Sequence, residues 1–212
     1  MDTLFVIEQL KQCFTDSEKI FSSLENNIKT YTNGFWGTTL LIEQTPFDFE
    51  RSNIKRGKKM MKPPKNKANK FFHIQNEEGT VVAIFGYAEH YEYPDIYIFF
   101  QRSHEIETIY TFDIQKKMSS VQRNFINRNK IFASILLQKK GNYIAETYYY
   151  DELDRLYKIE RKHKDEVYFK DTIFFPDHIY STYFILEYSK EDRLPNKIFW
   201  NAPRRESKQI WP

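Results

Sequence analysis

The N-terminal part of the chain carries an apolar stripe with helical spacing. From Leu4 onward, large apolar side chains recur at three- and four-residue intervals, which places them on one face of a helix. Thr15-Asp16-Ser17-Glu18 matches the Ser/Thr-x-x-Glu capping box that begins many helices. We therefore expect two helices, at about 3–14 and 16–29, with a single bent helix as the alternative.

Short runs of Val, Ile, Phe and Tyr replace this pattern later in the chain. Polar turns separate them about every ten residues, the spacing of an antiparallel meander. Ile96–Phe100 is apolar at every position, so we expect a second layer to cover it on both faces. Ile106–Ile114 alternates between apolar and more polar residues, which predicts one buried and one solvent-facing side. We predict roughly ten strands over 71–201, after a first strand at Phe35–Gln44.

Residues 45–70 interrupt this regularity. Pro46, Gly57 and the pair Pro63-Pro64 stand among lysines and asparagines, and proline is excluded from most helix interiors and central strands. We therefore expect a long basic loop. From Arg51 onward this loop contains nine Lys and Arg residues and no acidic residue, so the whole-chain net charge of +3 leaves −6 on the rest of the chain.

The cations of the loop are candidate nucleic-acid contacts. Clustered lysines and arginines bind phosphate backbones with release of counter-ions, and Phe71 and Phe72 follow the loop directly, where they suit stacking on bases. A loop kept in water by its charge is the alternative. The candidate residues are Arg51, Lys55, Arg56, Lys58, Lys59 and Lys62.

The composition is that of an ordered protein. Hydrophobic residues make up 41% of the 212 residues and aromatics 17%, unlike the charged, aromatic-poor composition of disordered chains. No apolar run approaches the roughly 20 residues that span a bilayer, no signal peptide is recognisable, and the lone Cys13 cannot form an internal disulfide. We predict a cytoplasmic α+β domain over 1–212, mainly β, in which the helical segment 1–30 packs on a large curved antiparallel β-meander over 71–201.

Side chains with catalytic or metal-binding chemistry are scattered along the chain. The five histidines show neither His-x-His nor His-Glu-x-x-His spacing, so the sequence contains no such zinc motif. His104-Glu105 and Asp177-His178 each resemble half of an acid/base pair, but we favour turn or surface roles for them, because such neighbours arise readily in a chain that is 29% charged. No glycine-rich phosphate loop or nucleophile elbow occurs in the sequence. We expect no metal, no cofactor, and binding in preference to catalysis; an enzyme whose site the sequence hides is an alternative.

A short repeat marks two of the expected hairpins. Tyr150–Leu156 and Tyr188–Leu194 share Tyr-x-x-x-Asp-Arg-Leu, and Lys-Ile follows each copy. The pattern predicts that Tyr and Leu anchor the two arms, while Asp and Arg face water at the tip. The first copy resembles the YD repeat, Tyr-Asp-x-x-Gly-Arg-Leu, of bacterial RHS and polymorphic-toxin proteins, with Asp154 at the glycine position. This resemblance implies a hairpin meander and a place in a bacterial toxin system, and it assigns no catalytic residue.

Tyrosines on the expected strands are the candidate binding residues. Consecutive strand residues point to opposite faces, so Tyr149 lies opposite Tyr148 and Tyr150. Tyrosine combines apolar area with a hydroxyl and is enriched at binding sites, although ordinary core packing is the alternative. The candidates for partner contact are Tyr148, Tyr150, Tyr183 and Arg155.

These observations favour a non-catalytic protein-binding domain, such as an immunity or antitoxin-like partner in a bacterial toxin system. The acidic balance outside the loop suits a basic protein partner. Two further functions stay open. One is a small-ligand carrier that uses the concave face of the sheet, which a deep pocket with convergent polar groups would favour. The other is a nucleic-acid-contacting protein that uses the basic loop.

Overall fold

A computed structural model of the chain describes residues 2–52, 54–88, 92–164, 180–189, 192, 194–202 and 207–211. Two N-terminal helices precede one sheet of twelve antiparallel strands, whose spatial order equals their order in sequence. The elements are α1 (Thr3–Thr15), α2 (Ser17–Ile28), β1 (Gly34–Gly37), α3 (Asp48–Arg51), β2 (Lys70–Gln75), β3 (Val81–Tyr87), β4 (Ile96–Arg102), β5 (Ile106–Asp113), β6 (Met118–Asn127), β7 (Lys130–Gln138), β8 (Tyr143–Tyr150), β9 (Leu156–Lys164), β10 (Tyr180–Glu187), β11 (Lys197–Asn201) and β12 (Lys208–Trp211). The predicted meander with N-terminal helices is confirmed: β2–β11 are the ten strands expected over 71–201, β1 begins the expected first strand, and β12 is additional.

The two N-terminal helices divide where the sequence predicts. The carboxylate of Asp2 caps α1 by accepting hydrogen bonds from two backbone N–H groups of its first turn. The predicted capping box is wrong, because Thr15 is the last residue of α1 and no side chain caps α2. Ser17 instead accepts a hydrogen bond from the backbone N–H of Met118 at 2.9 Å, which fixes the start of α2 to β6. None of the described helices has the length and apolar character needed to cross a membrane.

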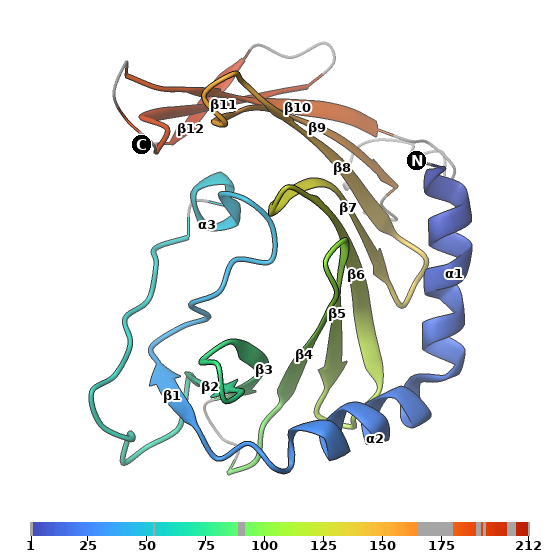
Figure 1. Ribbon diagram of the computed structural model, residues 1–212, viewed down its shortest axis with the longest axis vertical. Coiled ribbons are helices and arrows are strands. Elements are labelled where there is room, and N and C mark those ends of the chain that lie inside the picture. The colour runs from blue at the N-terminus through green and yellow to red at the C-terminus, as the bar shows by residue number, and fades with distance from the viewer. Residues whose placement is uncertain are drawn as a thin grey trace, which may run out of the picture.

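The sheet curves strongly, so that it has a convex and a concave side (Figure 1). α1 and α2 lie along the convex side (Figure 1), where Leu10 and Phe21 enter the largest apolar cluster, here called the convex core. The ring of Phe21 lies 5.6 Å from that of Phe99 and 5.0 Å from that of Phe112, both in edge-to-face contact. Such contacts add to the burial of apolar area that holds the helices on the sheet.

Residues 38–69, here called the strap, run across the concave side between β1 and β2 (Figure 1). Leu40 and Ile42 of the strap pack on apolar side chains of β3–β5. Tyr97–Phe100 are therefore buried on both faces, as predicted, whereas Ile96 at the start of β4 is exposed. The predicted solvent-facing side of Ile106–Ile114 is wrong at its centre, because Ile109 is buried in the same apolar cluster as Leu40 and Ile42 of the strap.

The first strand and the loop also differ from expectation. β1 is four residues long and ends at Gly37, whereas the sequence predicted a strand that continues to Gln44. A Cβ atom at Gly37 would lie 2.7 Å from the carbonyl oxygen of Thr39, so glycine permits the chain to turn there onto the concave side. The expected loop contains α3, which lies against the concave side near β12 (Figure 1).

Candidate partner-binding site

A hollow of about 470 Å³ lies where the β8–β9 turn meets the strap. Its walls combine aromatic and aliphatic side chains with one guanidinium and one carboxylate. They are formed by Pro46, Phe47, Tyr150, Leu153, Asp154, Arg155, Leu156 and Tyr188. Aromatic residues and arginine are the types enriched at protein interfaces, so this hollow is the candidate binding site.

The β8–β9 turn that forms one wall is fixed by Asp151. One oxygen of its carboxylate accepts hydrogen bonds from the backbone N–H groups of Leu153 and Arg155, at 2.9 and 2.8 Å. The other oxygen accepts from Nε of Arg155 at 2.9 Å. Asp154 adopts a left-handed conformation with φ of 65°, which aspartate tolerates better than most residues. The turn therefore holds Leu153 outward at the edge of the hollow, where it is largely exposed.

Tyr150 and Tyr188 occupy the same position in the two copies of the repeat and have the same structural role. The hydroxyl of Tyr150 donates to the carbonyl oxygen of Ile131 at 2.8 Å, and that of Tyr188 donates to the carbonyl oxygen of Leu156 at 2.7 Å. Each tyrosine thus ties its hairpin to the preceding one. Burial raises the pKa of both phenols to about 12, so both remain neutral donors at neutral pH.

The two copies of the repeat differ at their leucines, and Arg193 of the second copy lies outside the described residues. Leu156 is buried as predicted, whereas Leu194 is exposed. Arg155 does not face water freely, because it pairs with Asp151 and lies over the ring of Tyr188, 5.1 Å from its centroid. The predicted arrangement is therefore right for Leu156 and wrong for Arg155 and Leu194.

The opposite wall of the hollow is Phe47 of the strap. Phe47 has φ of 56° and ψ of 32°, a left-handed conformation that is unusual for a bulky residue and costs roughly 1–3 kcal/mol. Its side chain packs on the apolar cluster of β8–β12, here called the C-terminal cluster. Its carbonyl oxygen accepts a hydrogen bond from the backbone N–H of Arg51 at 2.9 Å. The position of Phe47 therefore depends on how α3 is anchored.

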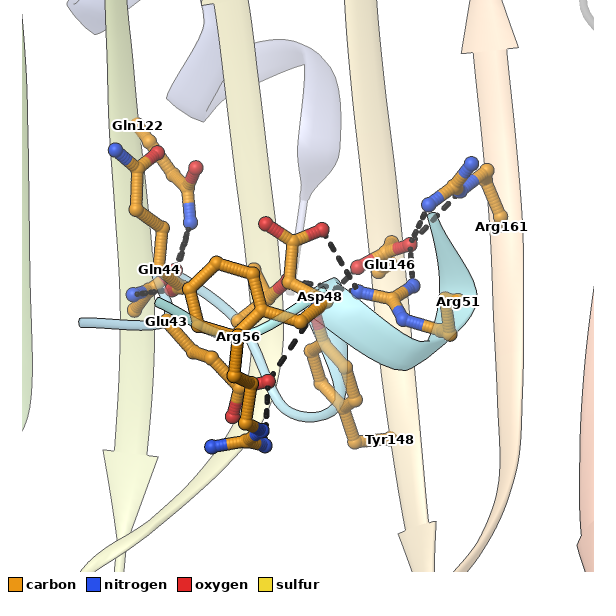
Figure 2. Close-up of polar contacts among 12 residues, drawn as sticks. Glu43, Gln44, Asp48, Arg51, Arg56, Gln122, Glu146, Tyr148 and Arg161 are labelled. Atoms are coloured by element: carbon orange, nitrogen blue, oxygen red, sulfur yellow. Dashed lines mark hydrogen bonds and ion pairs between the residues drawn. The ribbon is translucent and has the colours of Figure 1, made fainter. Parts of the chain in front are cut away.

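An ion cluster beneath α3 provides that anchor (Figure 2). Nη1 of Arg51 lies 2.6 Å from Oε1 of Glu146, and Nη2 donates to the hydroxyl of Thr45 at 2.7 Å. Nε of Arg161 donates to the same oxygen of Glu146 at 2.8 Å. The hydroxyl of Tyr148 donates to the second oxygen of Glu146. Three side chains, from α3 and two strands, thus converge on one buried carboxylate, and Thr45 of the strap binds Arg51.

The two guanidinium groups keep this carboxylate charged. Burial by itself would raise the pKa of Glu146, but Arg51 and Arg161 outweigh it and lower that pKa to about 2. The cluster is therefore ionised at neutral pH. Removing one partner from such a buried pair leaves an uncompensated charge and typically costs about 3–5 kcal/mol. The ion cluster thus clamps the strap to β8 and β9.

The strap also covers the polar centre of the concave face. The carbonyl oxygen of Gln44 accepts hydrogen bonds from Nε2 of Gln122 at 3.0 Å and Nδ2 of Asn124 at 2.8 Å (Figure 2). These buried amides also bond within the sheet: Nε2 of Gln122 donates to Oδ1 of Asn124 at 2.8 Å, and Nδ2 of Asn124 donates to Oε2 of Glu107 at 2.9 Å. The chain's own backbone therefore occupies the place that a small-ligand carrier would use on the concave face.

The structure brings together two of the four predicted partner-binding residues. Tyr150 and Arg155 line the hollow. Tyr148 is buried against Glu146 in the ion cluster, so it supports the strap. Tyr183 lies on the convex side, because its neighbour Phe184 points into the concave C-terminal cluster. The residues that the sequence did not single out for binding are Pro46, Phe47, Leu153 and Tyr188. For Tyr188 the repeat provided a signal, since it matches Tyr150.

The predicted basic-loop residues separate into two groups. Arg51 is buried and bound to Glu146, so it is not available to a nucleic acid. Arg56 pairs with Glu43 at 3.0 Å and with Glu50 at 2.8 Å. Both carboxylates belong to the part of the strap that precedes the basic stretch. The exposed cations are Lys55, Lys58, Lys59 and Lys62.

Of the two candidate acid/base pairs, His104 and Glu105 lie within the described residues. His104 and Glu105 line a second hollow of about 490 Å³ together with apolar side chains of β6 and β7. Asp177 and His178 lie outside the described residues. Within the described part of the chain, no group of three His, Cys, Asp or Glu side chains is placed to hold a metal ion.

Comparisons of the chain with known protein families, with curated proteins and with solved structures find no match. Evidence about function therefore comes from the chemistry of the described residues. The hollow at the β8–β9 turn is the strongest candidate site, because two predicted binding residues, Tyr150 and Arg155, line it and the exposed Leu153 lies at its edge.

Proposed function

We propose that this protein is a non-catalytic protein-binding domain whose partner inserts a side chain or short segment into the hollow at the β8–β9 turn. One observation carries the proposal: Phe47, Tyr150, Tyr188 and Arg155 converge on this hollow, with Leu153 exposed at its edge. Tyrosine and arginine dominate binding hot spots. A partner that buries Leu153 gains free energy from apolar area that the fold leaves in water.

The distribution of polar atoms supports a protein partner over a small polar ligand. The hydroxyls of Tyr150 and Tyr188 already donate to backbone carbonyls, and Nε of Arg155 already donates to Asp151. A small-molecule site needs convergent polar groups that are free to orient its ligand. The terminal nitrogens of Arg155 remain as donors, which suits a carbonyl or carboxylate of the partner.

The biological setting that we propose is a bacterial toxin system, in an immunity or antitoxin-like role. The resemblance of Tyr150–Leu156 to the YD repeat supports it. So does the conformation of Asp154, whose left-handed φ is the one that glycine adopts easily. The net charge of −6 outside the basic segment suits a basic partner and would mainly speed association.

The test compares two substitutions at leucines of equal exposure. Leu153 is 69% exposed at the hollow and Leu4 is 67% exposed on α1. We expect Leu153→Asp to weaken partner binding by at least about tenfold, the effect of losing a hot-spot residue. We expect Leu4→Asp to leave binding unchanged. The measurement is quantitative co-purification from the native host, followed by titration of the purified partner.

The control outcomes are distinct. Equal loss of the partner with Leu153→Asp and Leu4→Asp would show that the hollow is not the site. A preparation of the wild-type chain that retains a small molecule and no protein would contradict protein binding itself.

A further inference from the structure

A second surface combines exposed lysines with aromatic rings at the β1 edge of the sheet. Beyond Gly37 the strap returns to pair with β1: the backbone N–H of Met60 donates to the carbonyl oxygen of Trp36 at 2.8 Å, and Lys59 forms a β-bridge with Gly37. Because side chains alternate along paired strands, Lys58 lies on the same face as Trp36. Lys59 points to the other face.

The face that carries Trp36 and Lys58 is the convex side. Trp36 pairs with Phe72 in register, and Phe72 pairs with Phe85, which packs against the convex core. Tyr87 follows two residues after Phe85 and pairs with Lys70, so both side chains share this face.

Three rings form a continuous aromatic cluster there. The ring of Trp36 lies 5.1 Å from that of Phe72 and 5.4 Å from that of Tyr87. All three side chains are half-buried. Nζ of Lys67 lies 5.4 Å from the centroid of Tyr87, which places a second lysine of the strap beside the rings. The structure therefore joins basic and aromatic residues that are distant in sequence.

The expected stacking residues change accordingly. Phe71 points to the concave side, where it joins the apolar cluster of Leu40 and Ile42, so it lies on the opposite face from Phe72. Phe72 stays on the convex face, and Trp36 and Tyr87 join it. The sequence alone gave no reason to associate these last two residues with the basic segment.

The charge of the strap is not neutralised by the fold. Of the nine cations between residues 51 and 70, Arg51 and Arg56 are bound to carboxylates. The seven lysines form no ion pair with any described residue: these are Lys55, Lys58, Lys59, Lys62, Lys65, Lys67 and Lys70. Lys58, Lys67 and Lys70, which have no ion pair among the described residues, lie on the face of the half-exposed rings and make a surface that is complementary to a polyanion with aromatic bases.

We propose that this convex surface at the β1 edge, formed by Lys58, Lys67 and Lys70 around Trp36, Phe72 and Tyr87, binds single-stranded nucleic acid. The lysines contact the phosphates, and unpaired bases stack on the rings. A duplex keeps its bases stacked on one another, so it would reach the lysines but not the rings. The surface is separate from the hollow at the β8–β9 turn, and this activity does not depend on the protein partner proposed above.

The test measures fluorescence anisotropy with labelled oligothymidylate and oligouridylate of about 20 nucleotides, longer than the roughly 4–16 that one such site covers. We compare Lys58→Glu/Lys67→Glu with Lys139→Glu/Lys140→Glu, which makes the same change in net charge at exposed lysines of the β7–β8 turn. We expect the first pair to weaken binding at least tenfold more than the second. We also expect the slope of log affinity against log salt to fall by about 0.7 for each phosphate contact removed.

Trp36 provides a readout of stacking. Bound oligonucleotide should quench tryptophan fluorescence in the wild-type chain, and Trp36→Phe should abolish this quenching while it keeps most of the affinity. Thymine also carries a methyl group that uracil lacks, so a comparison of oligodeoxyuridylate with oligouridylate identifies the sugar that the surface prefers.

Four results would overturn the proposal. They are no binding at low salt, equal losses from the two lysine pairs, equal affinity for single strands and duplex, and tighter lysine-dependent binding to phosphatidylserine vesicles than to either oligonucleotide.

Discussion

The two halves of the sheet are built from similar strands but are covered differently. In β2–β7 the convex face packs under α1 and α2. On the concave face, Leu40 and Ile42 of the strap cover β3–β5, and Gln44 covers the centre of β6. In β8–β12 Phe47 and α3 cover the concave face. On the convex face of that half, Tyr183 remains 42% exposed, whereas Phe99 on the convex face of the first half is 1% exposed.

The exposed convex face of the second half is stabilised by pairs of polar and aromatic side chains. Nζ of Lys158 lies 5.2 Å from the ring of Tyr149 and 6.0 Å from that of Tyr183. The hydroxyl of Tyr149 donates to Glu160 at 2.7 Å. The comparison teaches that a second layer, not the strand sequence alone, decides whether an aromatic strand residue becomes core or surface.

The largest expected effect tests how the second half keeps its concave cover. Arg51 and Arg56 both belong to the strap and both bind carboxylates, but their side chains are 2% and 53% exposed. Arg51→Ala leaves Glu146 buried with one guanidinium fewer, and we expect it to lower the free energy of unfolding by about 3–5 kcal/mol. Urea denaturation followed by circular dichroism measures this change.

Arg56→Ala is the matched control for this prediction. Arg56 is exposed and Glu43 and Glu50 are half-buried, so solvent screens these pairs more than the buried one, and we expect a smaller loss of about 1 kcal/mol. Similar losses for the two variants would mean that the buried ion cluster is not what clamps the strap.

The next effect tests the cover of the first half through pH. His73 is buried under the strap, and its Nε2 accepts a hydrogen bond from the backbone N–H of Leu41 at 3.2 Å. Burial lowers the pKa of His73 from 6.5 to about 4. The unfolded chain therefore binds a proton at a higher pH than the folded chain does, so stability falls as pH drops from about 6.5 to about 4. Above pH 6.5 this group has no effect.

We expect His73 to account for a loss of up to about 3 kcal/mol across that window. Denaturation curves at several pH values should show a flatter dependence in His73→Gln. The exposed His104 gives the control, since His104→Gln should keep the wild-type slope. An unchanged slope in His73→Gln would contradict the assignment.

The smallest expected effect is at Tyr183, and it is compared with the effect at Phe99 on the convex face of the first half of the sheet. Tyr183→Ala removes a side chain that is largely in water, so we expect a change below about 1 kcal/mol. Phe99→Ala opens a cavity in the convex core and should cost about 3–5 kcal/mol. Thermal and chemical denaturation of both variants provide the measurement. A large loss at Tyr183 would show that this face is also packed.

Local patterns in the sequence were enough to predict much of the fold. The helical stripe and its division at Asp16 are confirmed, because helix periodicity is set by residues a few positions apart. The hairpin at Tyr150–Leu156 could also be expected from its sequence, since Asp151 forms its hydrogen bonds within the turn itself. The candidate site was predicted only in the part that this turn supplies, Tyr150 and Arg155.

The remaining features depend on contacts between distant residues. Composition predicted a basic loop, yet Arg51 is buried because it meets Glu146, 95 positions away in the chain. Tyr148 and Tyr183 are tyrosines on strands, as Tyr150 is. Only the curvature and cover of the sheet place Tyr148 in the ion cluster and Tyr183 on the convex face.

The sequence by itself thus determined the helices, the meander and the chemistry of the β8–β9 turn, because these follow from periodicity and short-range hydrogen bonds. Tertiary structure alone decided that the strap lies inside the curve and that Phe47 completes the hollow. It also decided that Trp36 and Tyr87 join the lysines of the strap. The physical reason is that strand register and sheet curvature, which no local pattern encodes, select which distant side chains share one face.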